Sequence, residues 1–193
     1  MIYLDNNATT RVHPEVFEAM APFLADEYGN PSTGYRLGKT AKAAVDNARG
    51  QVADLIGAQA DEIVFTSCGT EADNSAIASA IACQPQKRHI VLSSVEHSAI
   101  LLFAKSLAPE LECTELGVDQ GGRIDLEELR AAIRPDTALV SIMWANNETG
   151  VCQPVAEAAA IAHQGGALFH TDAVNAVGKI PISVTGGSID YLS

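Results

Sequence analysis

The sequence predicts an α/β fold in which helices flank a mostly parallel sheet, and two observations carry this prediction. Short apolar, β-branched runs recur along the chain, and each is continuous rather than alternating, which is typical of strands buried on both faces. Helix-like stretches lie between these runs, as right-handed strand–helix–strand crossovers require. The predicted strands are 63–65, 90–92, 138–143 and 167–169, and the predicted helices are 13–27, 40–56, 71–82, 98–107, 126–133 and 155–163.

Several helix ends carry recognisable local chemistry. Asp125 precedes Glu128 by three residues, which is the spacing of a capping box ahead of an apolar run. Pro154 stands near the start of its helix, where a missing N–H costs nothing. Gly57 and Gly165 lie where helix C-termini are expected. Residues 191–193 look like a strand that has just begun, so we expect the chain to be truncated.

Composition excludes several classes of protein. The formal net charge is −12, with 24 acidic against 12 basic residues, so a nucleic-acid partner is not expected. No apolar run approaches the ~18–20 residues that span a bilayer, and the N-terminus lacks the basic start of a signal peptide. We therefore expect no membrane partner and a cytoplasmic location. The four cysteines show no C-x-x-C pair and no histidines at zinc spacing, which predicts reduced, mostly buried thiols and no metal site.

The most informative local feature is the turn at residues 65–71, which reads Phe-Thr-Ser-Cys-Gly-Thr-Glu. A predicted strand enters this turn and a predicted helix leaves it. Small residues let the backbone approach a ligand closely, and the free N–H groups of a helix start attract an anion. The turn matches neither a P-loop nor a dinucleotide fingerprint. Taken alone, it fits either a phosphate site or an ordinary tight connection.

Polar residues also follow the other predicted strands. His97 opens a helix, where it either caps the helix or faces a ligand. Asn147 belongs to an Asn-Asn-Glu-Thr-Gly turn that could equally be structural. Asp172 follows a buried strand, where a carboxylate is costly unless it is paired, so it either caps the next helix or holds a protonated ring nitrogen. Their recurrence at successive strand ends favours one shared site.

Taken together, these motifs resemble the cysteine desulfurases, and the nearest branch is the NifS-like type. The resemblance covers nearly the whole chain in order. The motifs that carry it are 3–10 (YLDNNATT), 29–32 (GNPS), 65–71 (FTSCGTE), 96–97 (EH), 144–150 (WANNETG) and 170–179 (HTDAVNAVGK).

The resemblance implies a fold-type I enzyme that uses pyridoxal 5'-phosphate (PLP) to remove sulfur from L-cysteine. The products would be L-alanine and a persulfide, which passes to an iron–sulfur scaffold or another acceptor protein. By motif match, Gly69 and Thr70 would bind the cofactor phosphate, and His97 would stack on the ring and act in catalysis. Asp172 would pair with the pyridinium nitrogen, which keeps the ring an electron sink.

Two amides complete the implied cofactor site. Asn147 would lie beside the substrate and the phenolic oxygen of the cofactor. Asn175 stands where the family usually has glutamine, so its shorter side chain departs from the pattern. The Schiff-base lysine of the family is expected just past Ser193, and the persulfide cysteine further on. Lys179 aligns with a structural Gly-Lys pair instead, and none of the cysteines here matches the nucleophile.

The resemblance also implies how the chain is organised. Residues 1–12 form an N-terminal segment near the cofactor site, and residues 13–193 form an incomplete PLP-binding large domain. We expect the fragment alone to be inactive and the full-length protein to be a homodimer. The alternatives are another fold-type I lyase, such as a selenocysteine lyase or a cysteine-sulfinate desulfinase, or a binding module that holds PLP without chemistry.

Overall fold

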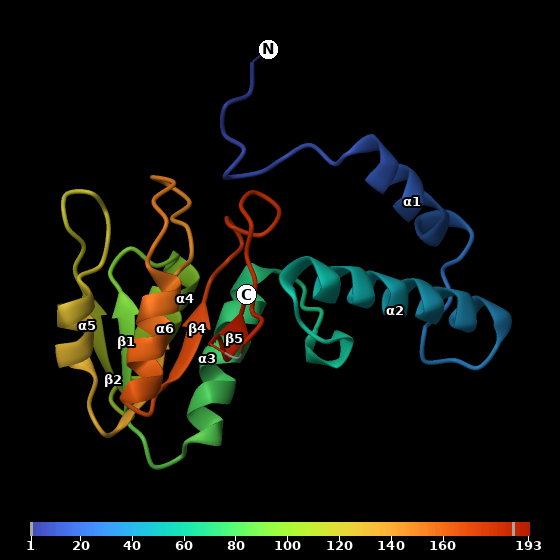
Figure 1. The fold of residues 1–193 in the computed structure, drawn as a ribbon. Helices are drawn as coiled ribbons and strands as arrows, with labels where there is room; N and C mark the ends of the chain where they lie inside the picture. The colour runs from blue at the N-terminus through green and yellow to red at the C-terminus, as the bar shows by residue number, and fades with distance from the viewer. Residues whose placement is uncertain (1, 187) are drawn as a thin grey trace. The chain divides into compact units, whose positions relative to one another are not determined.

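The computed structural model describes residues 2–186 and 188–193, which divide into two compact units. The first unit ends at Val64, and the second runs from Phe65 to Ser193. Most elements of both units are labelled in Figure 1.

The first unit is helical. Its elements are α1 (Pro14–Ala25), α2 (Arg36–Ile56) and the 3-10 helix η1 (Ala60–Glu62). Gly57 ends α2 with a φ of 76°, a left-handed conformation that glycine adopts without steric cost, as the sequence predicts. The 29–32 motif forms a turn before α2, in which Asn30 Oδ1 accepts from the backbone N–H of Ser32 at 2.9 Å. A side chain at Gly38 would collide with the backbone of this turn, so α2 packs closely against it.

The second unit is a five-stranded sheet in the order β2-β1-β3-β4-β5, and every neighbouring pair is parallel. This arrangement confirms the predicted α/β fold with a parallel sheet. The strands are β1 (His89–Ser93), β2 (Glu112–Leu116), β3 (Thr137–Ser141), β4 (Leu168–Thr171) and β5 (Tyr191–Leu192), and the helices are α3 (Gly69–Cys83), α4 (Ser98–Ser106), α5 (Leu126–Ala132) and α6 (Val155–Gln164).

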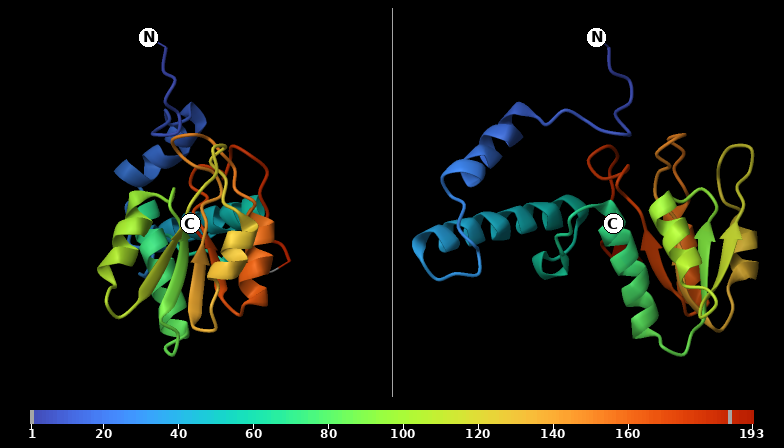
Figure 2. Two further views of the ribbon diagram at one scale, coloured as in Figure 1. Left: turned by 90° about the vertical axis from the view of Figure 1, so that its left-hand side faces the viewer. Right: turned by 180° about the vertical axis from the view of Figure 1, so that it is seen from behind.

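Helices cover both faces of the sheet (Figures 1 and 2). Val91, Val140 and Phe169 pack toward α5 and α6 on one face. Ile90, Leu92 and Leu139 pack toward α3 and α4 on the other. Because successive strand residues point to opposite faces, these continuous apolar runs bury both sides of the central strands. Each side chain buried in this way contributes about 1.5–3 kcal/mol.

The strand order reverses direction beside β1. After β1 the chain crosses through α4 to β2 on one side, and then returns through α5 to β3 on the other side of β1. In open α/β sheets, ligands bind beyond the carboxyl ends of the strands at such a switch point. The loops that follow β1 and β3 are therefore the first place to look for a site.

The predicted helices all occur, with ends shifted by a few residues, but two strand assignments differ. Residues 63–65 do not form a strand: Val64 and Phe65 are exposed, and the guanidinium of Arg49 donates to the Ile63 carbonyl. The edge strand β2 was not predicted from the sequence. The expectation of mostly buried cysteines is also wrong, because Cys68 and Cys83 are exposed and the other two are half-buried; all are free thiols.

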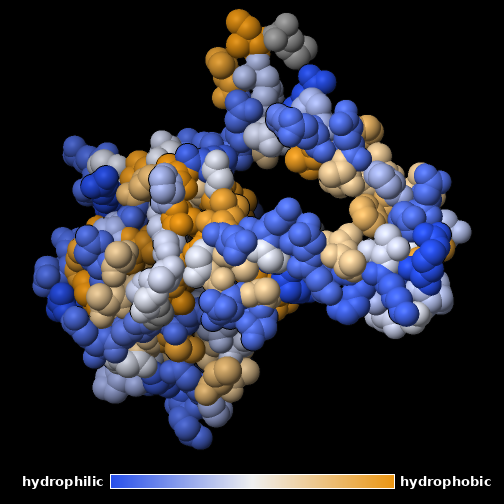
Figure 3. All heavy atoms as spheres, turned by 45° about the vertical axis from the view of Figure 1, so that its right-hand side comes forward, coloured by the Kyte–Doolittle hydropathy of each residue, from blue (hydrophilic) through white to orange (hydrophobic). Residues whose placement is uncertain are grey.

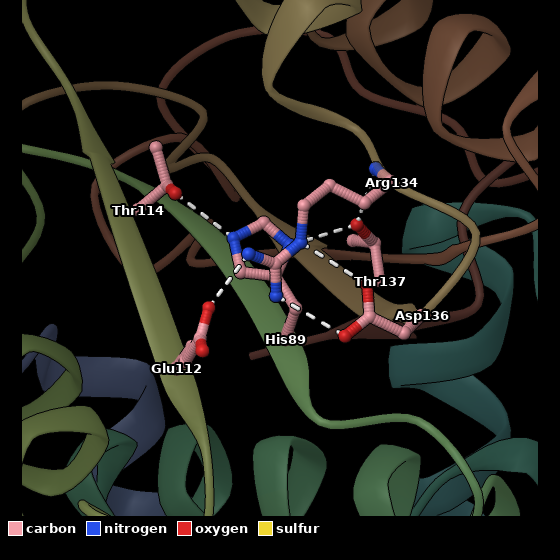
Figure 4. A network of polar contacts seen from close by, with 6 residues as sticks. All are labelled: His89, Glu112, Thr114, Arg134, Asp136 and Thr137. Atoms are coloured by element: carbon pink, nitrogen blue, oxygen red, sulfur yellow. Dashed lines mark hydrogen bonds and ion pairs between the residues drawn. The ribbon is translucent and has the colours of Figure 1, made fainter.

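A polar network ties the amino ends of three strands together (Figure 4). His89 of β1 is buried, and its ring nitrogens lie 2.8 Å from Thr137 Oγ1 on β3 and 2.9 Å from Thr114 Oγ1 on β2. Beside it, Arg134 bridges the carboxylates of Glu112 and Asp136. This network lies at the edge of the sheet opposite to the strands' carboxyl ends.

Apolar side chains are exposed on both units (Figure 3). Helix α1 buries none of its residues, and Phe17, Met20 and Leu24 are exposed along it. On the second unit, Leu102 and Val174 are also exposed. No helix in the described parts of the chain is long and apolar enough to cross a membrane.

Candidate functional site

The predicted site residues of the second unit come from the start of α3 and from the loops that follow β1, β3 and β4. Because all strands are parallel, these loops share one edge of the sheet. The start of α3 reaches the same edge, since a side chain added at Gly69 would come within 3.1 Å of Val174 Cγ2 in the loop after β4. The fold thus gathers Gly69, Thr70, His97, Asn147, Asp172 and Asn175 at one edge of the sheet.

The turn before α3 is held by a carboxylate. Glu71 Oε2 accepts from both the backbone N–H and the hydroxyl of Ser67, each at 2.6 Å. These bonds lower the pKa of Glu71. Cys68 is the N-cap residue, and helix α3 begins at Gly69 and Thr70 with no side-chain cap. Hydrogen bonds to the backbone N–H of Glu71 and the Ser67 hydroxyl lower the pKa of the exposed Cys68 thiol, as expected beside a helix N-terminus.

His97 is the N-cap residue of α4. Its Nδ1 accepts from the backbone N–H of Ala99 at 3.2 Å, which leaves Nε2 as the protonated nitrogen of the neutral ring. The side chain is exposed, and its positive charge, when present, lowers the pKa of Asp172. His97 is therefore a cap and also a neighbour of Asp172, so the two alternatives drawn from the sequence are compatible.

The turn after β3 is organised by Asn146 rather than by Asn147. Asn146 is buried, and its Oδ1 accepts from the backbone N–H groups of Glu148 and Thr149 at 3.0 and 2.9 Å. Its Nδ2 donates to the Val95 carbonyl at 3.0 Å, which joins this turn to the loop after β1. Asn147 is half-buried, and its Nδ2 donates to Glu148 Oε1 at 3.0 Å.

Asp172 directly follows β4 and is buried, with 7% of its surface exposed. Its Oδ1 accepts from the backbone N–H of Val174 at 3.0 Å, and no described residue donates to Oδ2. Burial raises its pKa, and the Val174 hydrogen bond and the charge of His97 oppose this rise. A buried carboxylate with an open oxygen is suited to a cationic N–H donor.

Asn175 lies in the turn that follows Asp172 and is half-buried. Its Oδ1 accepts from Lys179 Nζ at 2.5 Å, four residues further on. The lysine is thereby engaged with its own turn, which agrees with the structural role that its Gly-Lys motif implies.

A buried group of acids and a histidine behind Asp172 was not assigned to the site from the sequence. Glu96 accepts from the backbone N–H of Met143 at 2.7 Å, and Asp73 Oδ1 lies 3.7 Å from Nε2 of His170. His170 is itself held by the hydroxyls of Ser141 at 2.8 Å and Ser193 at 3.0 Å. The available signal was their position, since Glu96 adjoins His97 and His170 lies two residues before Asp172.

These residues fit a phosphorylated pyridine cofactor. The start of α3 offers backbone N–H groups and a hydroxyl at a helix N-terminus, where phosphate binds. Asp172 is 7% exposed, and its open Oδ2 is an acceptor for a ring N–H. His97 and the amides of Asn147 and Asn175 lie on the loops around it.

Comparisons with known proteins identify the family to which the chain is similar. The sequence profile of the family "Aminotransferase class-V" matches residues 2–193. Cysteine desulfurase 2 of Trichormus variabilis is 54% identical over an alignment of 194 positions, which covers 100% of this chain and 49% of that protein. The chain thus spans about half the length of the curated relatives it matches.

Solved structures show the same likeness. A protein titled "NIFS-LIKE PROTEIN" superimposes with a TM-score of 0.95 at 39% identity, over 99% of this chain and 53% of that one. The structure "SspA in complex with cysteine" superimposes with a TM-score of 0.94 at 36% identity, over 99% of this chain and 56% of that one. These families depend on PLP, which confirms the cofactor class that the motifs predict. With a fold, a set of strand-end residues and a profile match that all agree, the chain belongs to the class-V aminotransferase family.

Proposed function

We propose that this chain is the cofactor-binding part of a PLP-dependent cysteine desulfurase. The observation that carries the proposal is Asp172, a buried carboxylate at the carboxyl edge of the sheet whose Oδ2 is open to a cationic donor. Curated relatives named cysteine desulfurase match the whole chain at about 50% identity. Bound PLP would supply an electron sink for the carbanion formed beside the ring.

Each site residue then has a role. The backbone at Gly69 and the hydroxyl of Thr70 bind the phosphate at the start of α3. His97 stacks on the ring from the loop after β1, and Asp172 holds the ring nitrogen in its protonated form. Asn147 lies beside the substrate and the phenolic oxygen, and Asn175 contributes the amide that the family's longer glutamine usually supplies.

The substrate of the complete protein is L-cysteine, which is also the ligand named for the SspA structure. The C–S bond of the substrate breaks and an S–S bond forms with a protein thiol, giving L-alanine and a persulfide. That thiol and the cofactor lysine belong to the half of the relatives that this chain does not span. We further propose a cytoplasmic homodimer that passes sulfur to an iron–sulfur scaffold or another acceptor.

The experiment uses these 193 residues in two forms: alone, and joined to the carboxyl-terminal half of the relatives, which we term the completed protein. We expect the completed protein to form one L-alanine for each L-cysteine consumed, and to run as a dimer in light scattering. The 193-residue chain should produce no sulfide above the level of free PLP. Borohydride treatment followed by intact mass analysis should find no cofactor fixed to Lys179. Sulfide production by the 193-residue chain alone, or a cofactor adduct at Lys179, would show that these 193 residues carry out the chemistry themselves. Either result would contradict the proposal.

A further inference from the structure

Glu96 joins two loops at the switch point of the sheet. It lies in the loop after β1, and its Oε1 accepts from the backbone N–H of Met143, just after β3, at 2.7 Å. Those strands are neighbours in the sheet, and the crevice between their carboxyl ends is where a ligand is expected. The carboxyl of Glu96 thus links the two loops beside the place where a ligand is expected.

The loop after β3 also holds Asp172, through Trp144, the residue that follows Met143. The backbone N–H of Trp144 donates to the Asp172 carbonyl at 2.8 Å. Because Met143 and Trp144 are consecutive, the hydrogen bond from the Met143 N–H to Glu96 fixes the peptide next to the one that holds Asp172. A continuous path of hydrogen bonds therefore runs from the loop after β1, through the loop after β3, to the backbone of Asp172 after β4.

The second carboxyl oxygen of Glu96, Oε2, has an unusual environment for a charged carboxylate. Glu96 is 5% exposed, and its Oε2 is buried without a hydrogen-bond partner. The charged groups that face it are acids, Asp73 from α3 and Asp172 after β4. His170, the histidine beside these acids, offers them no positive charge near neutral pH, since it is buried and burial lowers its pKa to about 4.

A neutral Glu96 is the state that this environment favours. Burial raises the pKa of Glu96 well above its ordinary value, and the charges of Asp172 and Asp73 raise it further, against the hydrogen bond from Met143. A protonated Glu96 still accepts from Met143 through Oε1. It also adds no negative charge beside Asp172, which can then remain the anion that faces the crevice.

We propose that Glu96 is a positioning residue of the cofactor site, a neutral carboxyl that locks the loop after β1 to the loop after β3 and so fixes Asp172. This inference rests on the proposed function, because the group that Asp172 would hold is the PLP ring. As a positioning residue, Glu96 needs no contact with the cofactor or the substrate. It acts through Met143 and Trp144 on the placement of Asp172.

The test compares Glu96→Gln with Glu96→Ala in the completed protein. Glutamine keeps the acceptor for Met143 and is neutral, so it should retain the PLP affinity of the parent within a few-fold. Alanine leaves the Met143 N–H unpaired and frees the loop, so PLP affinity should fall about tenfold or more. Glu110→Ala is the control, since Glu110 is an exposed acid between α4 and β2.

A second measurement reports protonation directly and needs neither cofactor nor activity. The infrared spectrum of the cofactor-free protein should contain the carbonyl stretch of protonated carboxylic acids near neutral pH, to which Asp73, with a pKa of about 7, also contributes. Glu96→Gln should therefore lower this absorption and leave the part that belongs to Asp73. Absence of that change, or a glutamine variant as weak as the alanine variant, would overturn the neutral positioning role. So would an alanine variant that loses thermal stability but binds PLP normally.

The outcomes separate this inference from the function on which it rests. If the parent protein binds PLP and Asp172→Ala does not, the proposed cofactor site stands whatever Glu96 does. Normal PLP binding by Glu96→Ala alongside that result would defeat only the positioning role. Failure of the parent protein to bind PLP would defeat the proposed function itself.

Discussion

Asp73 Oδ1 lies 3.7 Å from Nε2 of His170, and both side chains are buried. Burial lowers the pKa of His170 to about 4, whereas burial and the charge of Asp172 raise the pKa of Asp73 to about 7. The contact is therefore not an ion pair at mildly acidic pH. It joins a neutral imidazole to a carboxyl that releases its proton only near neutrality.

This pair predicts two opposing pH dependences of stability. His170 binds its proton less readily when folded, so its contribution is lost as the pH falls from 6.5 toward 4. Asp73 binds its proton more readily when folded, so its contribution is lost as the pH rises from 3.8 toward 7. In the native chain the two slopes oppose each other between about pH 4 and 6.5.

Asp73→Asn should remove the opposing contribution of Asp73, so that the pH dependence of stability caused by His170 becomes visible. We expect the free energy of unfolding of this variant to fall by about 2 kcal/mol more than that of the parent between pH 6.5 and 4.5. Urea unfolding curves across that range would measure the difference. Identical pH profiles for the variant and the parent would show that the two groups do not titrate as described.

Asp172→Ala tests the residue on which the proposed function depends. In the completed protein we expect desulfuration to be lost, because the ring nitrogen would have no carboxylate to keep it protonated. The fold should persist, which circular dichroism would check, since the Asp172 backbone still bonds to Trp144. The control is Asp119→Ala, which removes a carboxylate that accepts from the Arg123 N–H in an exposed turn. Near-normal turnover of the Asp172 variant would refute the assignment.

The sequence predicted most of the sheet because its central strands are buried on both faces. Their continuous apolar runs, such as that of β3, have no polar face to confuse the pattern. The edge strand β2 was missed because its residues, Glu-Cys-Thr-Glu-Leu, are half polar and only Leu116 is buried. Residues 63–65 have strand composition, but a strand also needs a neighbour, and composition does not report one.

The site residues were predictable to the extent that they belong to turns at strand ends. Asp172 and His97 lie within five residues of the ends of apolar runs, so their position alone brings them to the ligand edge. Glu96 and Asp73 were not assigned because a single acid in a loop or helix ordinarily reads as a surface residue. Their burial arises from the packing of α3 and the loops after β1 and β3, which no local pattern encodes.

His89→Ala should weaken the fold without weakening the cofactor site. The change removes a buried hydrogen bond to Thr137 and a partly buried one to Thr114, and leaves a cavity in the sheet. We expect a loss of about 3 kcal/mol in the free energy of unfolding. PLP affinity should be unchanged under native conditions, because the network lies at the amino ends of the strands. Thr114→Val, which removes only one of these bonds, should cost less. A loss of PLP affinity that matched the loss of stability would contradict this separation.

Glu71 supplies the last test, because its carboxylate holds the turn before α3, at which the cofactor phosphate is proposed to bind. It accepts twice from Ser67, so Glu71→Ala should free the turn and reduce PLP affinity several-fold, whereas Glu71→Gln should retain part of the effect. The matched control is Glu157→Ala, since Glu157 is also an exposed acid in the first turn of a helix, α6. Both changes remove one negative charge that interacts favourably with the N-terminal end of a helix dipole, so only the Ser67 contacts distinguish the two variants.

The pH dependence of binding gives a second readout of the same carboxylate. The folded pKa of Glu71 is lowered, so its stabilising effect is present above the ordinary carboxyl pKa and disappears as the pH falls through the folded value. PLP affinity measured by absorbance titration should therefore weaken on acidification in the parent and depend less on pH in Glu71→Ala. Equal losses of affinity in the Glu71 and Glu157 variants would show that helix charge, and not the Ser67 turn, governs binding.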